Sequence, residues 1–183
     1  MSTIGIVGNT IMIIATFKAK RAKSPCHILI ASTCLADLCH ESGQYAFVYH
    51  FFRKTTMVQS DCFFMQLVPV IGASFGNPLI LNLGIDRLIA ITLPSRYRFL
   101  QTIPLIYVTC HFILPVTYTL YILVWAFLTK NETLVQCSVP QSFGNTAFGL
   151  LNQMGTIVNS GCKIERLRDF LGLIPPKQNL TLD

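Results

Sequence analysis

Asp37 is an acidic residue in the middle of a long apolar run, within Leu35-Ala36-Asp37-Leu38. If the run crosses a membrane, inserting this carboxylate costs at least about 2.5–3.5 kcal/mol, so it should face a bundle interior or a water-filled cavity. Acids at such depth commonly coordinate ions or act as switches. The alternative is a structural carboxyl that is protonated and hydrogen-bonded to a neighbouring Ser, Asn or water. Asp37 is therefore a candidate ion-coordinating or switch residue.

Asp86 and Arg87 are adjacent opposite charges at the end of another apolar run. At a membrane boundary such a pair can act as a lock, which opens when a partner or a proton takes one member. A simple interfacial pair, with Arg87 reaching towards lipid headgroups, explains the same spacing. Spacing alone favours the interfacial pair.

The sequence contains few features that would indicate an enzyme or a metal centre. It contains no nucleophile–base arrangement, phosphate-binding loop or HExxH motif. His40 and Glu41 lack a third ligand at helical spacing, so we interpret them as polar lining near an outer water cavity. We therefore expect no catalytic residues and no metal site.

The elements that must position these residues are apolar. Of 183 residues, 52% are hydrophobic and 12% charged, against roughly a quarter charged in soluble domains, and the mean hydropathy is +0.54. Long apolar runs between short polar stretches predict an all-α membrane protein. The net charge of +6 does not indicate nucleic acid binding, because the basic residues cluster as cytoplasmic loops do.

Four apolar runs predict transmembrane helices near residues 4–17, 25–52, 62–92 and 103–128, and a weaker fifth run covers 143–158. The first run is shorter than the about 20 residues that a bilayer needs, so we expect its outer half to be missing from this chain. Pro69 and Pro78 should kink the third helix. Residues 159–183 read as a tail of different, non-membrane character.

Basic residues and a glycosylation sequon agree on the orientation. Residues 18–23 and 87–98 hold seven basic side chains, and the two loops on the other side hold only Arg53, Lys54 and Lys130. This bias places residues 18–23 and 87–98 in the cytoplasm and the N-terminus outside. The sequon Asn131-Glu132-Thr133 then lies on the lumenal side, where Asn131 can carry a glycan.

Two of the seven cysteines, Cys62 and Cys137, flank apolar runs on this same oxidising side. A bridge between them would hold the outer loop across the mouth of the bundle and contribute about 2–4 kcal/mol. Two unpaired lumenal cysteines are the alternative, and the predicted topology favours the bridge. The chain has no CxxC motif, so a zinc or redox centre is not indicated.

Together these residues resemble the rhodopsin-like (class A) G-protein-coupled receptors. The resemblance rests on Gly8-Asn9, on Leu35-Ala36-Asp37-Leu38, on Cys62 at the start of the third run, and on Asp86-Arg87-Leu88-Ile89-Ala90-Ile91 followed by Pro94 and Tyr97. The residue pattern is most similar to that of nematode serpentine chemoreceptors of the Srsx class. This pattern includes Cys26-His27-Ile28-Leu29-Ile30-Ala31 in the second run. The resemblance covers roughly residues 4–140.

The resemblance implies roles for single residues. Asn9 and Asp37 would belong to an intramembrane polar network that holds a sodium ion, the one cofactor to consider. Asp86 would restrain Arg87 until a heterotrimeric G protein engages the cytoplasmic face. The Cys62–Cys137 bridge would cover the pocket of an unknown small-molecule or peptide ligand. The implied protein is a multi-pass chemosensory receptor of the plasma membrane, in contact with lipid and not with nucleic acid.

The sequence also departs from this family. Leu88 stands where Tyr is common, and the fourth run lacks its usual central tryptophan. Nothing resembles the sixth helix with Cys-Trp-x-Pro or the seventh with Asn-Pro-x-x-Tyr. We therefore expect residues 1–158 to be a partial seven-transmembrane domain of four helices, or five with the weak run. Such a truncated chain would not signal alone and would be retained in the endoplasmic reticulum.

A different class of protein fits the same runs. A small four-helix membrane scaffold or transporter subunit, complete as it stands, would have no G-protein coupling. It would reach the cell surface and be indifferent to the loss of Arg87.

Overall fold

The computed structural model describes residues 2–18, 25–129, 132–142 and 144–170. For residues 144–146 and 161–170 it describes the backbone only. The sequon residue Asn131 and the last part of the predicted tail, 171–183, lie outside the described residues.

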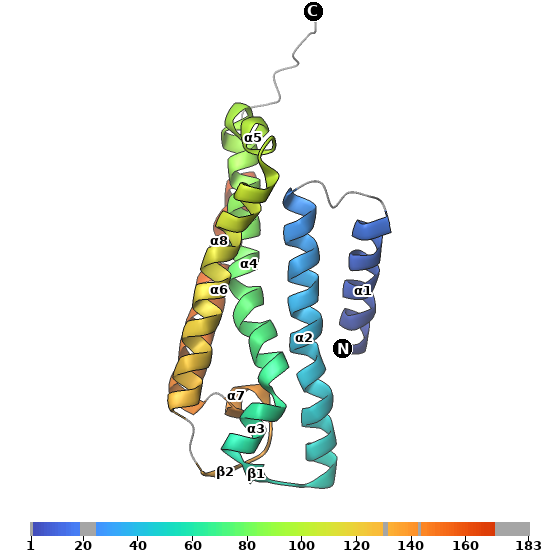
Figure 1. Ribbon diagram of the computed structural model, residues 1–183, viewed down its shortest axis with the longest axis vertical. Helices are drawn as coiled ribbons and strands as arrows, with labels where there is room; N and C mark the ends of the chain where they lie inside the picture. The colour runs from blue at the N-terminus through green and yellow to red at the C-terminus, as the bar shows by residue number, and fades with distance from the viewer. Residues whose placement is uncertain (1, 19–24, 130–131, 143, 171–183) are drawn as a thin grey trace, which may run out of the picture.

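Five long helices make up the described part of the chain: α1 (Ser2–Lys18), α2 (Pro25–Arg53), α4 (Leu67–Thr92), α6 (Pro104–Leu128) and α8 (Gly144–Phe170). The connections hold α3 (Gln59–Met65), α5 (Pro94–Leu100), α7 (Val139–Ser142) and the two-residue strands β1 (Met57–Val58) and β2 (Leu134–Val135). The long helices run side by side with alternating direction (Figure 1). The strands, α3 and α7 therefore share one end, and α5 lies at the other.

The outer surface of this bundle is apolar, which confirms an all-α membrane protein. Ile4 and Phe17 of α1 are 77% and 66% exposed, and Leu105 and Ile113 of α6 are 80% and 58% exposed. Large apolar surfaces of this kind are excluded from water-soluble proteins and are usual where helices face lipid. By length and composition, α4 and α6 are able to cross a bilayer, and α1 is a shorter apolar helix. That α1, α2 and α8 also cross stays a prediction.

Two helix boundaries differ from the sequence prediction. The run expected as one helix over 62–92 is interrupted at Gln66, which separates α3 from α4. Pro69 consequently falls in the first turn of α4, where its missing N–H removes no helical hydrogen bond, whereas Pro78 lies inside the helix. The weak fifth run is helical, and α8 continues past residue 158 to Phe170, because residues 165–168 (Glu-Arg-Leu-Arg) are good helix formers.

The long helices α2 and α4 are in close backbone contact. A Cβ added to Gly72 would stand 2.5 Å from the carbonyl oxygen of Ala36 and 2.6 Å from the amide nitrogen of His40. One turn later, a Cβ on Gly76 would lie 3.4 Å from Cβ of Ala36. Small residues four apart let helix backbones meet in a membrane. This Gly-Ala-Ser-Phe-Gly spacing is visible in the sequence, although we did not single it out there.

The end of the bundle with β1, β2, α3 and α7 is the predicted outer end, and the chain that follows α6 ties it together. β1 pairs antiparallel with β2, with Met57 opposite Val135. Cys62 of α3 is bonded to Cys137 with an S–S distance of 2.12 Å, and both residues are fully buried. Two residues further on, Val139 of α7 enters the buried apolar core. The disulfide and the strand pair therefore fix the position of α7.

We expect Gly72→Ala to destabilise the bundle, because the new methyl group meets the backbone of α2. The cost should be about 1–3 kcal/mol, as for overpacking of other cores. Thermal unfolding in detergent micelles measures it. The matched control is Gly149→Ala in α8, where an added Cβ has nothing within 4 Å; there the higher helix propensity of alanine should leave stability equal or greater. Equal stability of wild type and Gly72→Ala would contradict the close contact.

Candidate functional site

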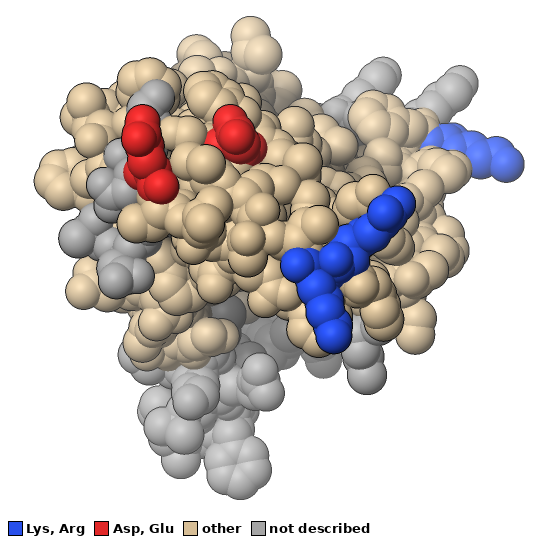
Figure 2. Space-filling model, turned by 90° about the horizontal axis from the view of Figure 1, so that it is seen from below, with Lys and Arg blue, Asp and Glu red and all other residues tan. Residues whose placement is uncertain are grey.

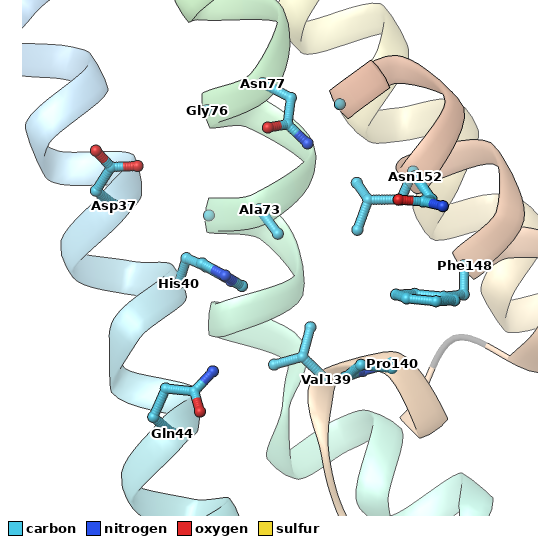
Figure 3. Close-up of a pocket in the computed structure, with 13 residues that line it drawn as sticks. Asp37, His40, Gln44, Ala73, Gly76, Asn77, Val139, Pro140, Phe148 and Asn152 are labelled. Carbon is cyan, nitrogen blue, oxygen red and sulfur yellow. The ribbon is translucent and has the colours of Figure 1, made fainter. Parts of the chain in front are cut away.

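A cavity of about 330 Å³ lies between α2, α4, α7 and α8. Asp37, His40 and Gln44 line it from α2, at spacings that place them on one helix face. Figure 3 shows these side chains on one side of the cavity, opposite those of α4, α7 and α8. The facing wall includes two amides and several apolar side chains: Asn77, Asn152, Ala73, Val139, Phe148 and Leu151.

Asp37 lines this cavity from the turn of α2 that faces Gly76. A Cβ on Gly76 would stand 3.7 Å from Oδ1 of Asp37, so the carboxylate lies close to the backbone of α4. Among the described residues, no side chain donates a hydrogen bond to it. The carboxylate thus retains free hydrogen-bonding capacity towards the cavity.

Asn9, which the resemblance pairs with Asp37, lies on the α1–α2 contact. The carboxylate of Glu41 occupies the place that a Cβ on Gly5 would take, and the hydroxyls of Thr3 and Tyr45 are 3.3 Å apart. In this antiparallel pair, moving one turn from Gly5 and Glu41 reaches Asn9 and Asp37. The register places these two residues at the same level, although no hydrogen bond joins them among the described residues.

The cavity offers oxygen atoms and no cluster of nitrogen or sulfur ligands. Hard cations are held by carboxylate and carbonyl oxygens, and Asp37, Asn77 and Asn152 present such groups. The described part of the chain brings together no group of three or more His, Cys, Asp or Glu residues. The donor set therefore fits a hard cation such as sodium.

The second candidate site is a charge cluster at the opposite end of α4. Asp86 is completely buried, and its Oδ1 accepts a 2.9 Å hydrogen bond from the hydroxyl of Tyr107 in α6. The hydroxyl of Tyr97 in α5 donates to Oδ2 at 3.5 Å. Nε of Arg87 lies 3.8 Å from Oδ2, and the Arg87 side chain is 50% exposed. The nearest partner of the buried carboxylate is therefore a tyrosine and not the adjacent arginine.

Aromatic packing holds these tyrosines in place. The rings of Tyr97 and Tyr107 meet edge to face at 6.4 Å, and the ring of Tyr107 meets that of His111 at 4.6 Å. Burial and, after it, the charge of Asp86 raise the pKa of Tyr97. The Tyr97 hydroxyl consequently stays protonated and remains a donor at physiological pH.

Tyr107 was missed at the sequence level as a partner of Asp86. Asp86, Arg87 and Tyr97 belong to one motif, but Tyr107 follows the next helix start, Ile103-Pro104, 21 residues after Asp86. A tyrosine in the first turn of the next predicted helix, at the same membrane boundary, was the available signal.

The outer end of the bundle carries few charged side chains. Figure 2 views it from below and shows basic and acidic groups on separate sides of a mostly uncharged face. The exposed charged residues there include Arg53, Lys54, Asp61 and Glu132. Arg53 is partly engaged, since its guanidinium lies 5.6 Å from the ring centre of Tyr49. No strong field of one sign covers this face.

Comparison with known proteins identifies the family of the chain. Residues 2–163 match the family model described as serpentine type 7TM GPCR chemoreceptor Srsx. A search of curated proteins finds no match. The matched segment contains α1, α2, α4, α6 and most of α8, together with Asp37, Asp86 and the disulfide. The chain belongs to the Srsx family of serpentine seven-transmembrane chemoreceptors.

Proposed function

We propose that this chemosensory membrane receptor binds a ligand in the cavity between α2, α4, α7 and α8 and engages a heterotrimeric G protein through Arg87. This departs from the expectation that a partial bundle does not signal alone, and a G-protein complex of this chain would contradict that expectation. The proposal includes delivery to the plasma membrane, with the disulfide on the outside. The observation that best supports this proposal is the exposure of the Arg87 side chain. Its guanidinium is half-exposed beside a buried carboxylate whose shortest hydrogen bond comes from Tyr107.

The Asp86–Arg87 pair is a lock that opens easily. At 3.8 Å with one partner half-exposed, such a pair contributes only about 0–1 kcal/mol. Removing Arg87 from it does not strand the carboxylate, because Tyr107 and Tyr97 continue to donate. Arg87 is therefore free to bind a partner at the cytoplasmic face at little cost.

We also infer that Asp37 and Asn9 act together as a sodium-binding polar network. The oxygen donors on the cavity wall and the α1–α2 register support this role. An ion there would neutralise a carboxylate that is expensive to place in a membrane.

Loss of Arg87 should abolish engagement of the G protein. The full chain is reconstituted in lipid nanodiscs and mixed with purified G-protein heterotrimers. The bound guanine nucleotide is then removed, and the amount of receptor–G-protein complex that remains is measured. We expect Arg87→Ala to reduce complex formation at least about tenfold, a loss of about 1.4 kcal/mol or more. Arg53→Ala removes the same charge at the outer end and should have no effect.

Two outcomes of this experiment would refute coupling through Arg87. One is a complex that forms equally with Arg87→Ala, and the other is a wild-type chain that forms no complex. The second result, in a protein that reaches the cell surface, is what the membrane scaffold alternative predicts.

Removing one tyrosine hydroxyl should reveal which donor stabilises Asp86. Tyr107→Phe deletes the 2.9 Å bond to a buried charge and should lower the free energy of unfolding by about 1.5–3 kcal/mol. Tyr97→Phe deletes the longer bond and should cost less. Tyr121→Phe, on the exposed side of α6, is the control. Melting temperatures in micelles rank the three variants, and an effect of Tyr97→Phe larger than that of Tyr107→Phe would contradict the assignment.

The orientation of the chain is tested at Asn131. We expect a glycan there, because the sequon lies in the loop on the disulfide side. With the second sequon, Asn179-Leu180-Thr181, removed by Asn179→Gln in every chain compared, glycosidase treatment should still increase the gel mobility of a chain that keeps Asn131. It should leave the added variants Asn131→Gln and Thr133→Ala unchanged. An unmodified Asn131 in a chain that has passed through the secretory pathway would argue against this topology.

A further inference from the structure

We propose that the cavity selects a small organic cation, an amine with an apolar body, by pairing its ammonium group with Asp37. This inference rests on the proposed function, in which the same cavity is the ligand site, and it adds the chemical class of the ligand.

The charge of the cavity favours a cation. Asp37 is the one charged side chain, and no lysine or arginine is present, among the described residues that line the cavity. An ionised carboxylate away from bulk water carries a large desolvation cost that a paired cation offsets. An anionic ligand would instead add a second, uncompensated negative charge. The cavity should therefore favour positively charged ligands over negatively charged ones.

Other polar groups without a side-chain partner line the same cavity as Asp37. Nδ1 of His40 is buried without a partner, and its ring points into the space between α2 and α4 (Figure 3). The amides of Gln44, Asn77 and Asn152 have no hydrogen bond to another described side chain. Buried polar groups are normally paired, so the buried Nδ1 of His40 can be satisfied by an N–H or O–H group of a ligand. The amides of Gln44 and Asn152 are exposed and remain available to the same ligand.

The other half of the cavity is apolar, which argues for an organic ligand. Phe148 and Leu151 of α8 and Val139 of α7 contribute this part of the wall. A fully hydrated inorganic ion would leave these side chains against water, whereas an apolar body would cover them. The volume of about 330 Å³ lies at the small end of the range of about 300–1,000 Å³ for small-molecule pockets. The size therefore suits a compact molecule better than a folded peptide.

A second hollow adjoins this cavity beside α7. It has a volume of about 280 Å³ and shares Gln44, Val139 and Pro140 with the first. Its remaining lining comes from Gly43, Phe47 and Ser138. α7 lies at the same end of the bundle as β1 and β2 (Figure 1), so the second hollow lies between the first cavity and that end. Ser138 and Val139 directly follow Cys137, and the bridge to Cys62 fixes this side of the second hollow.

Three probes of similar shape and different charge test the proposal. The full chain is placed in phosphatidylcholine nanodiscs in potassium buffer, so that sodium does not compete for Asp37. Binding of 2-phenylethylamine, 2-phenylethanol and 3-phenylpropanoate is measured by saturation-transfer NMR and titration. We expect the amine to bind at least about tenfold more tightly than the acid, with the alcohol between them.

The variant Asp37→Asn should remove this preference. It keeps the size of the side chain, and we expect it to weaken amine binding at least about tenfold while changing alcohol binding little. Asp61→Asn is the matched control, because Asp61 is an exposed acid of α3 outside the cavity. Equal binding of acid and amine by the wild type would overturn the proposal, and that comparison needs no variant. Absence of amine binding, or unchanged amine binding by Asp37→Asn, would overturn it as well.

The result is separable from the test of G-protein coupling. Arg87→Ala should bind the amine as the wild type does, because Arg87 lies at the other end of α4. Amine binding without a G-protein complex would refute the coupling and leave this inference standing. A G-protein complex in a chain that does not prefer the amine would do the reverse.

Discussion

The backbone contact between α2 and α4 at Gly72 and Gly76 is the constraint on which the two sites depend. In lipid, apolar side chains gain little by leaving the solvent, so helices associate through close packing and hydrogen bonds. Gly72 brings the backbone of α4 against Ala36 and His40 of α2. A larger residue there would separate the helices that carry Asp37 and Asp86, and it would change the cavity wall from which His40 extends.

Hydrogen bonds between helices extend this packing to the rest of the bundle. Nδ2 of Asn82 in α4 donates to the carbonyl oxygen of His111 in α6 at 2.6 Å. The hydroxyl of Tyr118 in α6 donates to the carbonyl oxygen of Leu150 in α8 at 3.1 Å. With the Tyr107–Asp86 bond, these contacts hold α6 against both α4 and α8 without relying on apolar burial. Such bonds are favourable in a membrane, because the bilayer core contains no water that could hydrogen-bond an unpaired polar group.

The sequence predicted the helices better than it predicted the contacts between them. Long apolar runs and basic loops were enough for the helical membrane class and for the approximate extent of α2 and α6, because these features are local. Cys62 and Cys137 could be paired because the topology put both on one side. The break at Gln66 was missed, since Gln66 is buried against Gly43 of another helix. The partner of Asp86 was missed for the same reason: the approach of Tyr107 depends on how α6 packs on α4.

The two sites are too far apart to touch the same ligand. From Gly72 to Asp86 is 14 residues, which at about 1.5 Å each separates them by about 21 Å along α4. Any effect of a cavity ligand on Arg87 must therefore pass through the helices, and α4 is the helix that carries residues of both sites. Pro78 lies between the two levels and deprives the backbone of one helical hydrogen bond, so α4 is most easily bent there. A ligand that pushes on His40 or Asp37 acts on the α2–α4 contact just before this weak point. Bending there would shift Asp86 against Tyr107 of α6, and the cytoplasmic cluster would respond to the cavity without any direct contact.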